Sequence, residues 1–245
     1  MIAALILAAL GPSCWDVYDA ALGHSARAVH PAYITYDEKF DIRTGDQNSP
    51  YAERGSSEAG IAHVQYRDDG LARVQDQRFG DAPIVTEYLD PGPPELGPYG
   101  ARRSMWIGVP DALPQIASVR ANSSVTCTMS VVPYEGRQTY HITFAGANPN
   151  TPHLDELWVD AQTHDIWKTA MEAPADYVYD STPRVRLAHY EVELSYESRY
   201  LVVKHVTWTA QVRMGPQSMK MDADYRFEGY AFPSTLPDRL FEPSS

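Results

Sequence analysis

The side chains with the clearest chemical potential in this 245-residue sequence are its eight histidines. None has the spacing of a local metal site, because the motifs H-x-x-x-H, HExxH and CxxC do not occur. His141, His189 and His205 fall on the polar faces of expected strands, where a solvated or hydrogen-bonded histidine is the ordinary outcome. A structure that placed them beside carboxylates in a cleft would instead favour a hydrolase of envelope material, the weakest of three functional hypotheses.

Acidic and serine-containing segments give no better candidates for catalysis. Asp222, Asp224 and Glu228 share one strand face, but nothing in the pattern places them in an apolar pocket. The loop 55–60 lacks the G-x-S-x-G spacing of a nucleophile elbow, and no glycine-rich phosphate loop occurs. The sequence therefore predicts that the protein is not an enzyme and has no catalytic residues, metal or cofactor.

The composition narrows the class of protein further. The formal charge is −12, and 44% of the residues are hydrophobic, which excludes a disordered chain. The longest basic cluster is the pair Arg102–Arg103, so we expect no nucleic-acid partner.

The N-terminus predicts export. Residues 2–10 are nine consecutive apolar residues, too few for a transmembrane helix but typical of the core of a secretory signal. We therefore predict a signal segment over residues 1–14. The alternative is a short apolar helix that continues into the fold.

The two cysteines leave several interpretations open. Cys14 follows the apolar run and is a weak candidate for a lipid anchor, because Leu10 and Pro12 do not fit the usual lipoprotein box. Cys127 lies on the apolar side of an expected strand, where an inert buried thiol is the favoured interpretation. A Cys14–Cys127 disulfide stays open, although no feature of the sequence favours it.

Most of the remaining sequence alternates between apolar and polar residues with a period of two, which is typical of antiparallel strands with one dry face. Before them, residues 15–22 have the spacing of a short amphipathic helix. The alternation predicts ten or eleven strands in one domain over residues 15–245, interrupted by a proline-rich connection over residues 90–122 with a short helix near 101–107.

So many strands with a single apolar face, and so few helices, must either stack as a sandwich or curl into a barrel. Their length and simple order favour one strongly curved antiparallel sheet, an incomplete β-barrel lidded by short helices. About ten strands around an apolar face leave room for a hydrophobic ligand. The aromatic and methionine side chains expected on the inner wall are Tyr190, Trp208, Met219, Met221, Tyr225 and Phe227. The alternative is that they pack only against one another.

Two segments carry a family resemblance. Residues 154–168 (LDELWVDAQTHDIWK) resemble a hairpin of the LolA-like proteins, and residues 236–243 (LPDRLFEP) are similar to the end of those chains. The resemblance implies an incomplete barrel, helices that cover an apolar hollow, and a location in the periplasm of a Gram-negative-type bacterium. It also implies a lipid, acyl-chain or lipoprotein ligand and an envelope membrane protein as a partner.

These observations lead to two main hypotheses. The first is an exported binding protein that holds an apolar ligand in a half-barrel and carries it across the periplasm. The second is an envelope sensory or interaction domain of the same fold without cargo.

Overall fold

The structure is a computed structural model. It describes residues 11–29, 31–46, 56–67, 71–79, 82–90, 119–120, 122–148, 153–172, 185–214 and 217–242. Most of the proline-rich segment 90–122, including the short helix expected near 101–107, and the signal segment up to residue 10 lie outside these ranges. No helix among the described residues is long and apolar enough to span a lipid bilayer.

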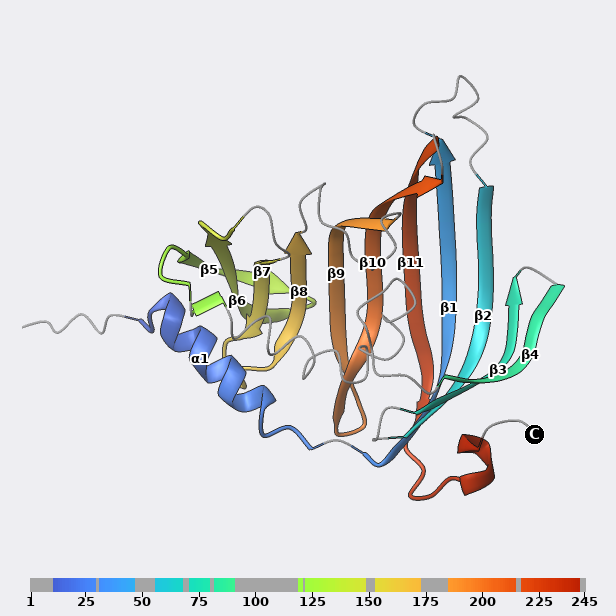
Figure 1. The fold of residues 1–245 in the computed structure, drawn as a ribbon. Coiled ribbons are helices and arrows are strands. Elements are labelled where there is room, and N and C mark those ends of the chain that lie inside the picture. Colours follow the sequence, from blue (N-terminus) through green and yellow to red (C-terminus); the bar gives the residue numbers. More distant parts are fainter. Residues whose placement is uncertain are drawn as a thin grey trace, which may run out of the picture.

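Eleven strands form one sheet in which all neighbours are antiparallel (Figure 1). The strands are β1 (Tyr33–Asp46), β2 (Ser56–Arg67), β3 (Ala72–Phe79), β4 (Ala82–Asp90), β5 (Thr126–Tyr134), β6 (Arg137–Ala145), β7 (His153–Asp160), β8 (Ile166–Glu172), β9 (Val185–Glu197), β10 (Tyr200–Met214) and β11 (Gln217–Ala231). Their spatial order is β4-β3-β2-β1-β11-β10-β9-β8-β7-β6-β5. The edge strands β4 and β5 do not pair with each other in the described ranges, so the sheet stays open. The predicted fold, a single curved antiparallel sheet with little helix, is confirmed.

One face of the sheet, called the apolar face below, carries the core. Val206 and Val192 face each other across β10 and β9, and Tyr225 and Phe40 face each other across β11 and β1. All four side chains are buried. The period-two alternation places polar residues on the opposite face, called the polar face below.

The predicted N-terminal helix is present as α1 (Cys14–Ser25), which lies against β5 and β7 at one end of the sheet (Figure 1). Ser13 begins it with a capping box, since the Ser13 side chain accepts from the Asp16 amide and the Asp16 carboxylate accepts from the Ser13 amide. Tyr18 is buried with its ring edge-on to Phe144, 5.6 Å between centroids. The helix therefore covers part of the apolar face.

The prediction that Cys127 is an inert free thiol is wrong. Cys14, the first residue of α1, forms a disulfide with Cys127 in β5. The sequence pattern could not reveal this bond, because the two residues are 113 positions apart and meet only when α1 packs on the edge of the sheet. The sulfur of Cys14 is consumed by the bond, so the weak prediction of a lipid anchor at Cys14 is also contradicted.

The C-terminal segment folds back onto the polar face at β1–β3. It ends in a 3-10 helix, η1 (Asp238–Phe241), which contacts β3. Buried Phe241 lies under the guanidinium of Arg67, 4.7 Å from the ring centroid. Arg73 of β3 donates to the carbonyl oxygens of Leu240 (2.6 Å) and Glu242 (2.9 Å). These contacts hold the end of the chain on the sheet.

Candidate functional site

Three of the six predicted ligand-binding side chains lie together on the apolar face. Trp208 of β10 and the pair Tyr225 and Phe227 of β11 are 2%, 4% and 5% exposed. The rings of Trp208 and Tyr225 are stacked with centroids 6.5 Å apart. The rings of Tyr225 and Phe227 are also stacked with centroids 6.5 Å apart. The pattern of alternation therefore placed these side chains correctly with respect to one another.

The structure says less about the side chains of the other three predicted residues. Tyr190 of β9 is half-buried and faces Trp208 across the β9–β10 pair. Met219 and Met221 belong to β11, where the backbone pairs them with Val212 and Ala210 of β10. The side chains of the two methionines lie outside what the structure describes. Whether any of the six contacts a ligand stays a prediction.

The aromatic cluster continues beyond the predicted residues toward the C-terminal end of β11. Tyr36 of β1 lies 5.9 Å from Phe227 and 5.5 Å from Tyr230 between ring centroids, and Phe232 stacks on Tyr230 at 6.3 Å. We call this row the aromatic stripe. Its six members are Trp208, Tyr225, Phe227, Tyr36, Tyr230 and Phe232.

Sequence reasoning missed Tyr230 because strict alternation from Phe227 places it on the polar face. In the structure the register shifts between Thr35 and Asp37, where two steps on β1 match three on β11. Gly229 takes a left-handed backbone with φ +67° at this bulge. A glycine inside a strand pattern is the signal that could have indicated the extra residue.

Glu38 is a second residue of the apolar face, and its charge gives no indication of that position. It occupies an apolar-face position of β1, opposite Phe227 and Ala62, and its side chain is completely buried. Burial raises the pKa of the Tyr230 hydroxyl well above its usual range, and the negative charges of Glu197 and Glu38 raise it further. A buried carboxylate therefore lies close to the aromatic stripe.

Trp208 carries an unusual polar atom. Its indole Nε1 is buried and has no hydrogen-bond partner among the described residues. Leaving such a donor unsatisfied costs about 1–3 kcal/mol. A ligand oxygen placed beside the ring would recover that cost.

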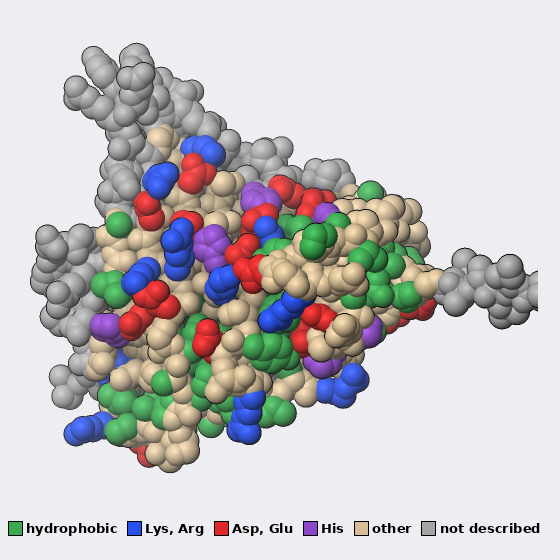
Figure 2. Space-filling view, turned by 180° about the vertical axis from the view of Figure 1, so that it is seen from behind, with side chains coloured by type: hydrophobic (Ala, Val, Ile, Leu, Met, Phe, Trp, Pro, Cys, Tyr) green, Lys and Arg blue, Asp and Glu red, His purple; other side chains and the backbone are tan. Residues whose placement is uncertain are grey.

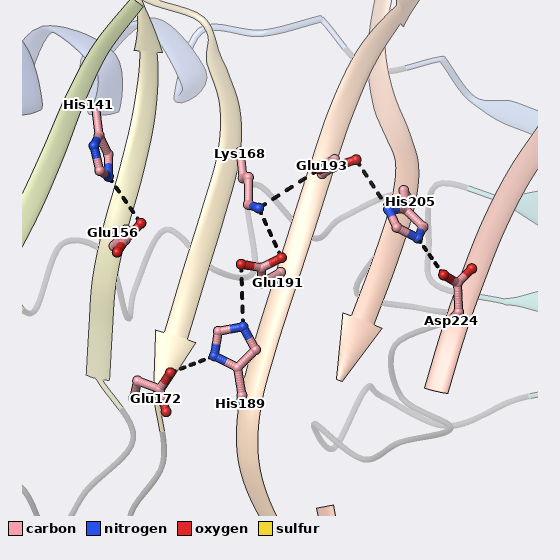
Figure 3. Close-up of polar contacts among 9 residues, drawn as sticks. All are labelled: His141, Glu156, Lys168, Glu172, His189, Glu191, Glu193, His205 and Asp224. Atoms are coloured by element: carbon pink, nitrogen blue, oxygen red, sulfur yellow. Dashed lines mark hydrogen bonds and ion pairs between the residues drawn. The ribbon is translucent and has the colours of Figure 1, made fainter. Parts of the chain in front are cut away.

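The polar face carries a row of ion pairs, called the ion-pair ladder below (Figures 2 and 3). Its nine members are His141, Glu156, Lys168, Glu172, His189, Glu191, Glu193, His205 and Asp224. The contacts form two groups, one that links β6 to β7 and one that links β8, β9, β10 and β11. Lys168 Nζ is 2.9 Å from Glu191 Oε2 and 3.9 Å from Glu193 Oε1. Cross-strand partners of opposite charge are the usual stabilising pairs of a sheet surface.

The three histidines predicted on polar strand faces all belong to this ladder. His141 Nε2 lies 3.0 Å from a Glu156 oxygen, and its ring stacks on Trp158 with centroids 4.3 Å apart. His189 contacts Glu172 at 2.5 Å and Glu191 at 3.4 Å through its two ring nitrogens.

His205 is held between two carboxylates. Its Nδ1 lies 3.2 Å from Glu193 and its Nε2 3.1 Å from Asp224. A neutral imidazole has only one N–H, so only the protonated ring donates to both acids. The hydrogen bond to Glu193, helped by Asp224 and opposed by burial, raises the pKa of His205. The same hydrogen bond lowers the pKa of Glu193.

A hydrolase would need histidines beside carboxylates and a cleft around them, and the ion-pair ladder provides only the first. The histidines do reach carboxylates, but among the described residues none of the three lines the pocket at the β9–β10 turn or the pocket at the β7–β8 turn. Both ring nitrogens of His189 and of His205 are already paired with carboxylates. No group of three or more potential ligands within the described ranges could hold a metal ion. The geometry therefore favours a stabilising role for these residues.

The raised pKa of His205 gives a testable pH dependence. A raised pKa contributes stability that is complete below the unfolded value of about 6.5 and is lost as the pH rises through the folded value. We expect the free energy of unfolding of His205→Gln to differ from wild type more at about pH 5.5 than at about pH 9. Urea titrations at both pH values measure the difference, and an equal difference at both would contradict the role given to His205.

Comparison with known proteins gives matches at the level of solved structures. No protein-family model matches the chain, and no curated protein matches its sequence. A LolA superfamily protein from Nitrosomonas europaea is similar at 8% identity, 94% coverage of this chain and 98% of the other, with a TM-score of 0.37. A DUF1329 family protein from Desulfovibrio piger has 9% identity, coverages of 92% and 95%, and the same TM-score.

A third similar structure is the Pseudomonas aeruginosa MucA/MucB complex, with 10% identity, coverages of 88% and 94%, and a TM-score of 0.25. The first of these matches bears the name of the family that residues 154–168 and 236–243 resemble. All three TM-scores lie below 0.5, so the function proposed next depends on this chain's own residues.

Proposed function

We propose that this chain is an exported binding protein that holds an apolar ligand, such as an acyl chain, a lipid or a lipoprotein, against the apolar face of its sheet and carries it across the periplasm. The observation that carries the proposal is the aromatic stripe on one face of an open sheet. Each methylene that a ligand buries there would contribute about 0.8 kcal/mol.

Two further observations support the proposal. The buried indole N–H of Trp208 offers a donor to a carbonyl or carboxylate oxygen of the ligand. The Cys14–Cys127 disulfide is a bond that persists in oxidising compartments, which agrees with export. A mature chain that keeps this bond must contain Cys14, so we propose that the signal segment ends before that residue and not at residue 14.

The burial of the stripe constrains how a ligand would bind. Because Trp208, Tyr225 and Phe227 are at most 5% exposed, a ligand that contacts them must displace the atoms that now exclude water from them. This burial also favours the second candidate function, an envelope sensory or interaction domain whose interior holds no cargo. A measurement of lipid binding distinguishes these two candidate functions.

The test of the proposed function is displacement of a fluorescent fatty acid, together with native mass spectrometry of the purified protein. We expect Phe227→Asp to weaken binding at least tenfold, because a carboxylate would enter the apolar wall. Glu228→Ala is the matched control, since Glu228 is the next residue and is exposed. Phe227→Ser replaces the aspartate variant if circular dichroism shows that the latter does not fold. Equal binding by wild type and the Phe227 variant, or no binding by wild type, would overturn the proposal.

A further inference from the structure

A pocket of about 670 Å³ lies where the β9–β10 turn meets the end of β11. Its lining includes Glu197, Arg199 and Tyr200 from the turn, and Tyr230 and Phe232 from the end of β11 and the residues after it. This volume is in the range of small-molecule sites, which is about 300–1,000 Å³. None of the six side chains predicted from the sequence lines it.

The pocket is continuous with the aromatic stripe. Phe232 and Tyr230 belong to both, and the Phe232 ring lies 4.6 Å from the ring of Tyr200 between centroids. Tyr230 in turn contacts Tyr36, which leads to Phe227. An apolar chain that followed the stripe would therefore reach the pocket with its end.

The charged groups of the pocket are one cation and one anion, and Ser198 adds a hydroxyl group to the lining. Arg199 is exposed, and its Nη2 donates to Tyr200 Oη at 2.7 Å while its guanidinium lies 5.0 Å from the centroid of the Tyr200 ring. These contacts orient the guanidinium and leave other N–H groups for a ligand, since a guanidinium has five donors. Glu197 supplies the negative charge on the same rim.

The hydroxyl group of Tyr230, which also lines the pocket, already has a hydrogen-bond partner. Tyr230 Oη donates to the carbonyl oxygen of Val203 at 2.5 Å, and its raised pKa keeps it protonated. The ionisable groups left for a ligand are therefore Arg199 and Glu197. The negative charge of Glu197, the nearby Glu38 and a net charge of −12 all disfavour a ligand head group with a net negative charge.

We propose that this pocket binds the zwitterionic head group of an amphiphile, with its phosphate or carboxylate at Arg199 and its ammonium group at Glu197. Arginine is suited to phosphate and carboxylate through parallel N–H donors. The ring of Phe232 offers additional attraction to the ammonium group. This inference rests on the proposed function, because the apolar chain of the same ligand would occupy the aromatic stripe.

The test compares three palmitoyl ligands below their critical micelle concentrations by calorimetry. They are lysophosphatidylethanolamine, lysophosphatidic acid and the uncharged monopalmitoylglycerol. We expect Arg199→Gln to weaken binding of both phosphate-containing lipids about tenfold, the loss of one charge-assisted hydrogen bond. We expect Glu197→Gln to weaken binding of lysophosphatidylethanolamine but to strengthen binding of lysophosphatidic acid, because it removes a repelling charge.

The uncharged ligand separates this inference from the proposed function. Monopalmitoylglycerol should bind wild type and both variants equally, and its failure to bind wild type would overturn the proposed function itself. If monopalmitoylglycerol binds, but both variants bind all three ligands as tightly as wild type does, the proposed head-group site is wrong. Free glycerophosphoethanolamine, which keeps the zwitterionic phosphodiester, is the last ligand tested. If it binds as tightly as the lysolipid, the pocket is a site for a soluble zwitterion and the lipid assignment is wrong.

Discussion

Replacing Cys127 with serine is expected to lower the free energy of unfolding by about 4 kcal/mol. The disulfide closes a loop between residues 113 positions apart, and a cross-link of that span removes much of the conformational freedom of the unfolded chain. The bond also fixes α1 to an edge strand. Besides the disulfide, the helix is held by the packing of Trp15 and Tyr18 on Phe144 of β6 and by the pair His24–Asp165.

Urea denaturation of wild type and Cys127→Ser under non-reducing conditions measures this effect. A reducing agent provides the control, because it should lower the stability of wild type to that of the variant and leave the variant unchanged. Amide hydrogen exchange should accelerate in α1 more than in β10 or β11, since only α1 loses its attachment. A stability difference below about 1 kcal/mol would show that packing alone holds the helix.

The strands were predictable because their signal is local. In most of β9, β10 and β11 apolar and polar residues alternate, and this period of two directly predicts which side chains share a face. Trp208, Tyr225 and Phe227 could thus be grouped from the sequence, and they are neighbours in the structure. The capping box of α1 is also a local signal, because Ser13 and Asp16 are only three residues apart at the start of the helix.

Features that depend on pairing between distant segments could not be predicted. The contact of His205 with Glu193 and Asp224 requires the register of three strands, including a shift in the β9–β10 pair between Val203 and His205. The pocket at Arg199 requires the end of β11 to reach the β9–β10 turn. Residue types alone do not contain that information, because many registers satisfy the same alternation.

Glu38 shows a different limit of sequence reasoning. Its position in the alternation of β1 indicates the apolar face, while its charge indicates the polar face, so residue type and pattern disagree at this position. The structure follows the alternation and buries the side chain. A charged residue at an apolar-face position is thus a signal of a buried polar site.

The second large effect is expected at Asp165, in the turn between β7 and β8. Its side chain is 2% exposed and accepts from three side chains, Tyr196 Oη at 2.9 Å, His24 Nε2 at 2.9 Å and Thr163 Oγ1 at 2.5 Å. These donors come from β9, α1 and the turn itself. Asp165 therefore joins the helix to the sheet at the end of α1 opposite the disulfide.

Asp165→Ala is expected to lower the free energy of unfolding by about 3 kcal/mol, because it removes three hydrogen bonds of about 1 kcal/mol each. Tyr196→Phe removes one of these hydrogen bonds and should cost about 1 kcal/mol. Burial, reinforced by the hydrogen bond to Asp165, raises the pKa of Tyr196 to about 12, so the hydroxyl remains a donor at neutral pH. The hydrogen bond therefore persists in the conditions of the measurement.

Gln162→Ala is the matched control, since Gln162 lies in the same turn and is exposed, and we expect its stability to equal that of wild type. Thermal and urea unfolding followed by circular dichroism measure all three variants. The disulfide and Asp165 hold opposite ends of one helix, so each single change also weakens the contact at the other end. The double variant Cys127→Ser with Asp165→Ala should therefore lose less than the sum of the two single changes. A strictly additive loss would mean that each contact stabilises its own part of the sheet and that α1 is not held as a unit.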